Sequence, residues 1–288
     1  MIIDCHAHFE PRMLDVDRVI AKMDAAGVER IALIPTMNDP LPHTPEALLS
    51  VIRSLMSDAR TRPLAEVVHR LTYRRDKNLH LSGKVFRIYR QPDNDSVAQL
   101  VVRYPERFYG WIFLNPAVDE RVLDTLERYR AQKGMVGIKL HPHWHDYKTE
   151  ILSPLLRRAE ELGLPVLVHL GFRKRGDFRA ICRSFPRLRV VSAHAGFPFY
   201  RDLWAYKGEC PNLYVDLSSP YIDERLAREA VAAMGPERCL YGTDAPYGFH
   251  ADDGTYDYGE IARWVERLPV TSAQRDAIFG ETFASLVA

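Results

Sequence analysis

Histidine, lysine and aspartate side chains follow several apolar segments of this 288-residue chain. Near its start, Ile2-Ile3-Asp4-Cys5-His6-Ala7-His8 places two histidines two residues apart, and on a β-strand that spacing turns both imidazoles to the same face. Two adjacent imidazoles form half of a metal site. Later apolar segments supply further polar residues at their ends, namely Lys139, His141, His169, His194 and Asp244.

Imidazoles and a carboxylate gathered at one place would suit a borderline divalent ion such as zinc, manganese or iron. Such an ion lowers the pKa of a bound water, and Asp244 could accept that water's proton and pass it to a leaving group. Each neutral imidazole also needs an acceptor for its other nitrogen, which Asp4 or a backbone carbonyl could provide for His6 or His8. One such histidine is typical of a structural hydrogen bond, but the whole set predicts a metal centre.

The elements that must position these residues alternate between apolar strands and amphipathic helices. Strands are predicted at residues 2–8, 31–35, 108–114, 135–141, 165–170, 188–194, 213–217 and 239–242. Eight strands, each followed by a helical segment, indicate an α/β fold, a single (β/α)8 TIM barrel over residues 1–288. An open doubly wound sheet is the alternative, but the glycine-rich phosphate loop that it needs is missing from the sequence.

Composition narrows the function classes. The hydrophobic content is 47% and the net charge is +1, which give no sign of a nucleic-acid or membrane partner. No apolar run is long enough to cross a membrane, and no signal-peptide pattern is seen at the start, so we expect a cytoplasmic protein. The four scattered cysteines, Cys5, Cys182, Cys210 and Cys239, are expected to be reduced.

Residues 38–95 interrupt the alternation and form a predicted insertion after the second strand. Apolar residues at helical spacing predict two amphipathic helices, at 48–56 and 64–71. Residues 53–90 hold ten Lys or Arg against three Asp or Glu, but no nucleic-acid-binding motif. We expect the insertion to be a lid or a contact in a homo-oligomer, rather than a nucleic-acid site.

The loops after the strands suggest a small, anionic substrate. Trp144 follows the fourth strand, Arg173 lies in the basic turn 173–175 after the fifth, and Tyr247 lies in the loop 245–257 after the eighth. Aromatic rings beside cations would suit a planar or apolar acid. Alternatively, the basic turn is a solvated surface turn, and the last loop is either a lid or an ordinary polar loop.

Five phrases in the right order, "IDCHAHF", "GIKLHP", "VLVHLG", "VSAHAGF" and "YGTDAP", closely resemble the amidohydrolase superfamily. The branch most similar is the amidohydrolase-related (amidohydrolase 2) branch, which also holds aromatic-acid decarboxylases. The resemblance covers nearly the whole chain. One departure is the last helix, where family members tend to have an Asn-Ala pair and this chain has Gly280 to Ala284.

The resemblance implies that His6, His8, His169 and Asp244 ligate a divalent metal, with zinc favoured and manganese or iron as alternatives. His194 would ligate a second ion or hydrogen-bond the reacting oxygen. Lys139 has two interpretations, a carboxylated lysine that bridges two ions or a plain ammonium that binds a substrate carboxylate. His141 lies two residues after Lys139 on the same inward face of the strand, where it would be either a wall of the pocket or a metal ligand.

The function implied is a metal-dependent hydrolase that uses metal-activated water on an amide, lactone or ester of a small organic acid. Asp244 would be its proton shuttle, and His194 would polarise the reacting oxygen. A metal-dependent non-oxidative decarboxylase of an aromatic or unsaturated acid is the first alternative. A catalytically silent metal-binding barrel is the second.

Overall fold

The computed structural model describes residues 1–250 and 256–288. Its centre is a parallel sheet of eight strands whose neighbours follow chain order. These strands are β1 (Ile3–His8), β2 (Arg30–Ile34), β5 (Phe108–Phe113), β6 (Met135–Leu140), β7 (Val166–Val168), β8 (Val190–Ser192), β9 (Leu213–Asp216) and β10 (Cys239–Leu240). The eight predicted strands are confirmed, and their ends differ from the predicted ones by at most two residues.

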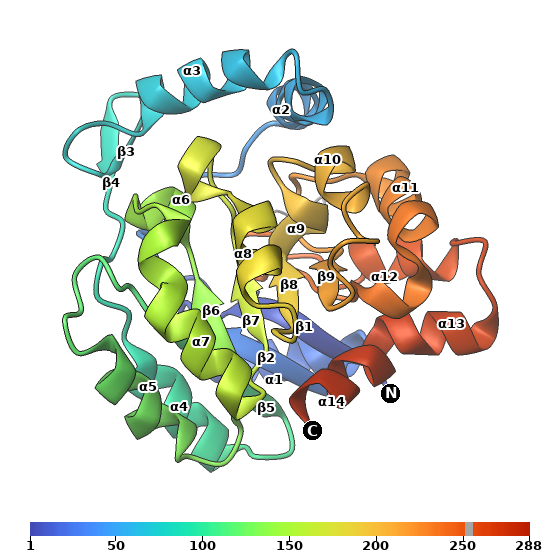
Figure 1. Cartoon of the computed structure of the whole chain (residues 1–288). Helices are drawn as coiled ribbons and strands as arrows, with labels where there is room; N and C mark the ends of the chain where they lie inside the picture. Colours follow the sequence, from blue (N-terminus) through green and yellow to red (C-terminus); the bar gives the residue numbers. More distant parts are fainter. Residues whose placement is uncertain (251–255) are drawn as a thin grey trace.

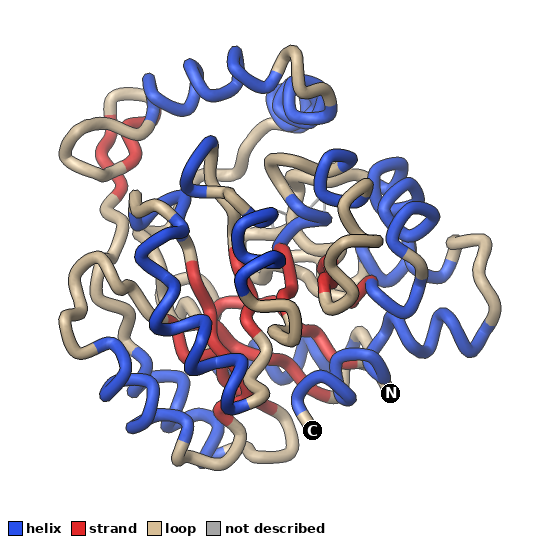
Figure 2. Tube along the Cα trace, viewed as in Figure 1, coloured by secondary structure: helices blue, strands red, loops and turns tan. Residues whose placement is uncertain are grey.

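The first and last strands approach each other, which curls the sheet into a nearly closed barrel. Cys5 N–H donates to the carbonyl of Tyr241 at 3.0 Å, and Asp244 N–H donates to the carbonyl of His6 at 2.7 Å. Figure 2 shows strands at the centre and helices around them. The TIM-barrel prediction is therefore confirmed.

Amphipathic helices cover the outside of the barrel, as their apolar stripes require. The longer ones are α1 (Val16–Ala25), α4 (Asn94–Arg103), α5 (Val122–Arg130), α7 (Ser153–Leu162), α8 (Phe178–Ser184), α11 (Glu224–Met234) and α12 (Glu260–Glu266). Asp15, Asp93, Asp177 and Asp223 cap four of these helices by accepting a backbone N–H from the first turn. These aspartates therefore define where the four helices begin.

The base of the barrel is filled by the C-terminal segment. Phe283, on α14 (Thr282–Val287), packs in the interior with Trp111, at 5.9 Å between ring centroids. Before it, α13 (Ser272–Asp276) continues into a π-helical turn at Ala277–Glu281. A side chain at Gly280 would lie 2.9 Å from the carbonyl of Met1, so glycine allows this turn to lie against β1.

The insertion contains α2 (Glu46–Ser57) and α3 (Arg62–Thr72), which confirms the two predicted helices. Figure 1 shows both helices lying beyond one end of the barrel. They are followed by a hairpin of β3 (Leu79–Leu81) and β4 (Lys84–Phe86), which the sequence analysis did not predict. Ser82 and Gly83 form its turn, both with positive φ.

The prediction of four reduced cysteines is wrong for two of them. Cys182 on α8 and Cys210 before β9 form a disulfide, with their Cα atoms 5.5 Å apart. The fold brings together two residues that are 28 positions apart and that no sequence spacing had linked. Cys5 and Cys239 are free and buried. Within residues 1–250 and 256–288, no helix combines the length and apolar character needed to cross a membrane.

Candidate metal and active site

A cavity opens where the carboxyl ends of the strands meet, as expected for this fold. Its volume is about 820 Å³, including its mouth. The polar lining comes mostly from strand ends, and the aromatic and apolar lining comes from the loops. The lining includes His6, His8, Lys139, His141, His169, His194 and Asp244, together with Met37, Leu41, His43, Trp144, Tyr221, Tyr247 and His250.

A β-bulge in β1 turns its two histidines into this cavity. Ile3 and Cys5 belong to the barrel interior, while Ala7 packs in the outer core. The pairing of β1 with β2 shifts register between Asp4 and Ala7. This extra residue changes the strand's phase, so that His6 and His8 both face the cavity.

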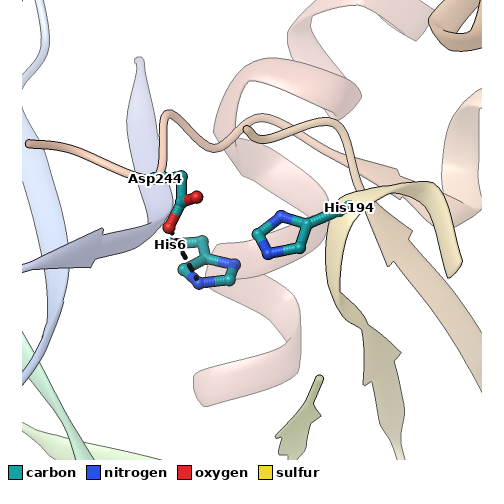
Figure 3. Close-up of side chains that lie close together, drawn as sticks. All are labelled: His6, His194 and Asp244. Carbon is teal, nitrogen blue, oxygen red and sulfur yellow. Dashed lines mark ion pairs between the residues drawn. The ribbon is translucent and has the colours of Figure 1, made fainter. Parts of the chain in front are cut away.

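His6, His194 and Asp244 form the centre of the site (Figure 3). One ligand atom from each lies within 4.8 Å of the others, and all three residues are buried. His6 Nε2 is 3.7 Å from Asp244 Oδ1, and the His6 and His194 rings stack with centroids 4.9 Å apart. This geometry gives a divalent ion two nitrogen ligands and one oxygen ligand.

The other predicted ligands surround this centre. His8 Nε2 is 3.3 Å from Asp244 Oδ1, and Lys139 Nζ is 3.4 Å from His6 Nε2. The His169 ring is 4.8 Å from the His194 ring, and its Nδ1 lies 3.0 Å from the Leu170 carbonyl oxygen. That contact leaves His169 Nε2 free for a ligand. All six predicted ligands therefore lie around one cavity, three of them in the tight cluster.

Burial sets the charges of the cluster. It lowers the pKa of His6 to about 3, helped by the positive charge of Lys139, and it also lowers the pKa of His194. Burial alone would raise the pKa of Asp244, but its electrostatic interaction with His194 and its hydrogen bond with His8 outweigh burial and hold that pKa below its usual range. Neutral imidazoles beside an ionised carboxylate are the forms that bind metal ions.

Lys139 is buried beside the cluster on the inward face of β6. Burial lowers the pKa of its ammonium to about 8, while the charges of Asp216 and Asp244 oppose this shift. The amine is therefore closer to losing its proton at neutral pH than an exposed lysine is. Both predicted roles of Lys139, a carboxylated bridge and an ammonium for a substrate carboxylate, are compatible with this position.

Asp216, at the end of β9, is the main functional candidate that the sequence analysis missed. Its Oδ2 accepts from His6 Nδ1 at 2.9 Å, and its Oδ1 accepts from the backbone N–H of His194 at 2.9 Å. Ser218 Oγ lies 2.8 Å from His194 Nδ1. These contacts use the Nδ1 atoms of both histidines and leave the Nε2 atoms for the cavity. The sequence does hold a signal for Asp216, because it is a carboxylate at the end of a predicted strand.

Asp4 does not have the role suggested for it. Its Oδ1 accepts from the backbone N–H of His6 at 2.9 Å and from that of Thr243 at 3.1 Å. It therefore joins β1 to the loop after β10, and it contacts no imidazole nitrogen of His6 or His8. Burial raises the pKa of Asp4 to about 7, although the hydrogen bonds from Thr243 and His6 oppose this shift.

The predicted substrate-binding residues separate into two groups. His141, Trp144 and Tyr247 line the cavity, where His141 stacks on His169 at 4.3 Å and Tyr247 lies edge-on to His8 at 5.3 Å. Arg173 does not line it, because its Nε donates to Glu66 of the insertion at 2.9 Å and its side chain is 69% exposed. Within the loop 245–257, residues 251–255 lie outside the described residues.

His145, on α6 (Pro142–His145), has a structural role. Its ring stacks on Phe113 at 5.1 Å, and its Nε2 is 3.1 Å from the carbonyl oxygen of Tyr89. Burial lowers its pKa to about 4, only partly opposed by the contact with Tyr89.

This histidine should make the metal-free protein less stable in mild acid. The unfolded chain protonates His145 near pH 6.5, whereas the folded chain does so near pH 4. Between these values the unfolded state binds more protons, so the free energy of unfolding should fall as pH falls, by up to about 1.4 kcal/mol per pH unit for this group. Urea unfolding at pH 7.5, 6.5 and 5.5 in EDTA measures the slope. An unchanged slope in His145→Gln would contradict the assignment.

Comparisons with known proteins identify the family of this chain. A family model described as amidohydrolase matches residues 3–285. A curated relative, the 2-amino-3-carboxymuconate-6-semialdehyde decarboxylase of Dictyostelium discoideum, is 26% identical over 198 residues, which cover 54% of this chain and 55% of the relative. The match thus spans about half the length of that relative.

Two solved structures share the fold across nearly the whole chain. The 5-carboxyvanillate decarboxylase of Sphingomonas paucimobilis has a TM-score of 0.61 and 18% identity, covering 99% of this chain and 98% of its own. A dihydroxybenzoic acid decarboxylase of Polaromonas was solved with manganese and 2-nitroresorcinol. It has a TM-score of 0.59 and 17% identity, covering 99% of this chain and 96% of its own. The family match confirms the predicted resemblance, and the chain belongs to the amidohydrolase family.

Proposed function

We propose that this chain is a metal-dependent, non-oxidative decarboxylase of a planar aromatic or unsaturated acid. The observation that carries the proposal is the buried cluster of His6, His194 and Asp244 beside Lys139, at the base of an aromatic-walled cavity. The similar proteins named above are decarboxylases, which favours this reaction over the hydrolysis first expected.

The residues present fit a divalent ion. His6, His194 and Asp244 would hold it, with His169 close enough to complete the coordination after a small side-chain movement. Bound there, the ion would supply positive charge for the substrate's carboxylate or a neighbouring oxygen. Manganese is the first ion to test, because one similar structure contains it, and zinc and iron follow.

The lining indicates how the acid would lie. Among the described residues around the cavity, Lys139 is the only lysine or arginine. The aromatic and apolar walls include Trp144, Tyr221, Met37 and Leu41. A planar acid would therefore place its carboxylate at the cluster and Lys139, and its ring against these walls. Arg173 has no part in this binding, since it pairs with Glu66.

Decarboxylation requires one proton at the carbon that loses its carboxylate. The carbon–carbon bond breaks, carbon dioxide leaves, and the electron pair that stays on the carbon takes up the proton. Asp244 Oδ1 and His8 Nε2 are 3.3 Å apart, so this pair can share and deliver that proton. Lys139 and the cluster hold the substrate so that the leaving carboxylate lies in the buried part of the site.

Isotopes distinguish the two reactions. The metal-loaded enzyme would be incubated with 2,6-dihydroxybenzoate, 5-carboxyvanillate and a panel of lactones and amides, in D₂O and separately in H₂¹⁸O. We expect release of carbon dioxide and one carbon-bound deuterium in the product. Incorporation of ¹⁸O into a new carboxylate, with no release of carbon dioxide, would instead establish hydrolysis.

Hydrolysis remains the second candidate because Lys139 is buried next to His6, with its pKa lowered to about 8. A lysine in that state could be carboxylated and bridge two ions, as the family resemblance first suggested. Two metal ions per chain would favour hydrolysis, and one would favour decarboxylation. The silent-barrel alternative is less well supported, because the cavity keeps a full set of ligand-type side chains.

A further inference from the structure

His141 differs from the candidate metal ligands in the position of its ring proton. It lies directly before α6, and its Nδ1 accepts the backbone N–H of Trp144 at 3.1 Å. Because a backbone N–H can only donate, Nδ1 carries a lone pair and the ring proton lies on Nε2. A doubly protonated ring would set two N–H groups against each other, so this contact favours the neutral form of His141.

Two candidate metal ligands have the opposite arrangement. His6 Nδ1 contacts Asp216 Oδ2 at 2.9 Å, and His169 Nδ1 contacts the carbonyl oxygen of Leu170 at 3.0 Å. Both partners are acceptors, so these rings hold their proton on Nδ1 and keep the Nε2 lone pair for an ion. The Nε2 atom of His141 is instead an N–H group, which has no lone pair to offer a metal.

This N–H group belongs to the wall of the cavity. His141 is 2% exposed and lines the cavity, and its ring stacks on that of His169, with 4.3 Å between centroids and 14° between planes. Within residues 1–250 and 256–288, the hydrogen bond from Trp144 is the only one that the His141 ring makes. Since the site is largely buried, an oxygen of a bound molecule would be a favourable partner for the Nε2 donor.

Contacts around α6 hold the donor in one direction. The backbone N–H of His145 donates to the carbonyl of His141 at 3.0 Å, which closes the turn of α6. Tyr73 of the insertion donates from its Oη to the carbonyl of Trp144 at 2.7 Å. The insertion therefore holds Trp144, whose N–H in turn holds the His141 ring. A donor fixed in this way loses little rotational freedom when it binds a ligand.

We propose that His141 donates from Nε2 to the substrate's carboxylate beside Lys139, as a neutral binding group and not as a metal ligand. This inference rests on the proposed function, because it gives the acid decarboxylated there a second donor. Lys139, two residues earlier, is the only lysine or arginine in the described lining, so the carboxylate belongs beside it. A carboxylate has two oxygens, one for the ammonium and one for the imidazole N–H.

The two groups are close enough to interact. Burial lowers the pKa of His141 well below its usual value, and the charge of Lys139 adds to this shift. Lys139 attracts the acid by its charge, whereas His141 adds a hydrogen bond of fixed direction. His141 should therefore strengthen the binding of a carboxylate more than that of a neutral ring of similar size.

Two substitutions separate the donor from the cap of α6. His141→Asn keeps an oxygen that can accept from the Trp144 N–H but has no group that reaches the Nε2 position, whereas His141→Gln places an N–H near that position. Calorimetry on the zinc-loaded full chain would compare benzoate, which has no ring hydroxyl, with resorcinol, which has no carboxylate. We expect His141→Asn to bind benzoate about 10- to 100-fold more weakly and resorcinol as the wild type does, with most of the benzoate affinity kept in His141→Gln.

Metal content, by elemental analysis, separates a substrate donor from a ligand. It should stay at the wild-type level in His141→Asn and fall in His169→Asn, and the urea midpoint reports folding. His80→Asn is the matched control, since it makes the same change on the β3–β4 hairpin outside the cavity lining and should alter neither binding nor metal. Loss of metal in folded His141→Asn, unchanged benzoate affinity, or equal losses for benzoate and resorcinol would each overturn the proposal.

Nitrogen-15 chemical shifts test the ring proton directly. In the zinc-loaded protein labelled at histidine, the signal of His141 Nδ1 should lie in the range of an unprotonated imidazole nitrogen and that of Nε2 in the range of an N–H nitrogen. Their disappearance in His141→Gln identifies them, and the reverse pattern would overturn the assignment. None of these measurements requires turnover, so a failure to release carbon dioxide would count against the proposed function and not against the role of His141.

Discussion

Replacing Asp244 by asparagine should lower kcat by about 1000-fold or more, because the change removes the carboxylate that shares a proton with His8. The amide is also a weaker metal ligand than a carboxylate, so affinity for the ion should fall in the same variant. The fold should persist. Asp244 has a φ of 60°, and asparagine is one of the few residues that adopt this left-handed conformation readily.

Three measurements separate these effects: turnover at saturating metal, metal content by elemental analysis, and the urea midpoint. Asp124→Asn is the matched control, since it makes the same chemical change at an exposed ion pair with Arg121 on α5. It should leave all three values near those of the wild type. Wild-type turnover in Asp244→Asn at full metal occupancy would remove Asp244 from the chemistry, whatever the reaction proves to be.

Sequence predicted the barrel well because each strand is a short apolar run that ends in a polar residue or a turn. The same rule located His6, His169, His194 and Asp244 at one rim, since the carboxyl ends of parallel strands meet there. A spacing of two residues on β1 predicted one shared face for His6 and His8, and in the structure a bulge between Asp4 and Ala7 turns that face to the cavity. The barrel and its site were therefore predictable from the local apolar pattern of each strand and from the rule that parallel strands end at the same rim.

The features that sequence missed depend on contacts between distant segments. The Arg173 side chain becomes unavailable to the cavity only because Glu66, more than 100 residues earlier, accepts its hydrogen bond. Cys182 and Cys210 meet because α8 packs beside the segment before β9. The β3–β4 hairpin has strands of only three residues, too short for an alternating pattern to be recognised.

Asp216 differs from these cases, because it could have been found by the rule that polar residues at the carboxyl ends of the strands form the site. Its replacement should also have a large effect on metal binding. Burial alone would raise the pKa of Asp216, but its electrostatic interaction and hydrogen bond with His6 lower that pKa and keep the carboxylate ionised. An ionised acceptor 2.9 Å from His6 Nδ1 holds the proton on that nitrogen and leaves the Nε2 lone pair facing the cluster. Asp216 thus sets which nitrogen of His6 can bind a metal.

Asp216→Asn should therefore weaken metal binding by about 10- to 100-fold, the range found when such supporting hydrogen bonds are lost. An asparagine whose NH₂ faces His6 Nδ1 would take that nitrogen's lone pair and move the imidazole proton to Nε2, where it blocks the ligand position. Chelator competition with manganese and with zinc measures the change, and the urea midpoint reports folding.

Asp4→Asn is the matched control for this effect, because Asp4 is equally buried and binds the backbone N–H of His6 but not its ring. It should alter stability without a comparable loss of metal affinity. Ser218→Ala should give a smaller loss of affinity than Asp216→Asn, since it removes the contact to His194 Nδ1 and leaves the bond between Asp216 and His6 in place. Equal metal affinities in wild type and Asp216→Asn would show that the His6 tautomer is set by another group, with Lys139, 3.4 Å from Nε2, the first to examine.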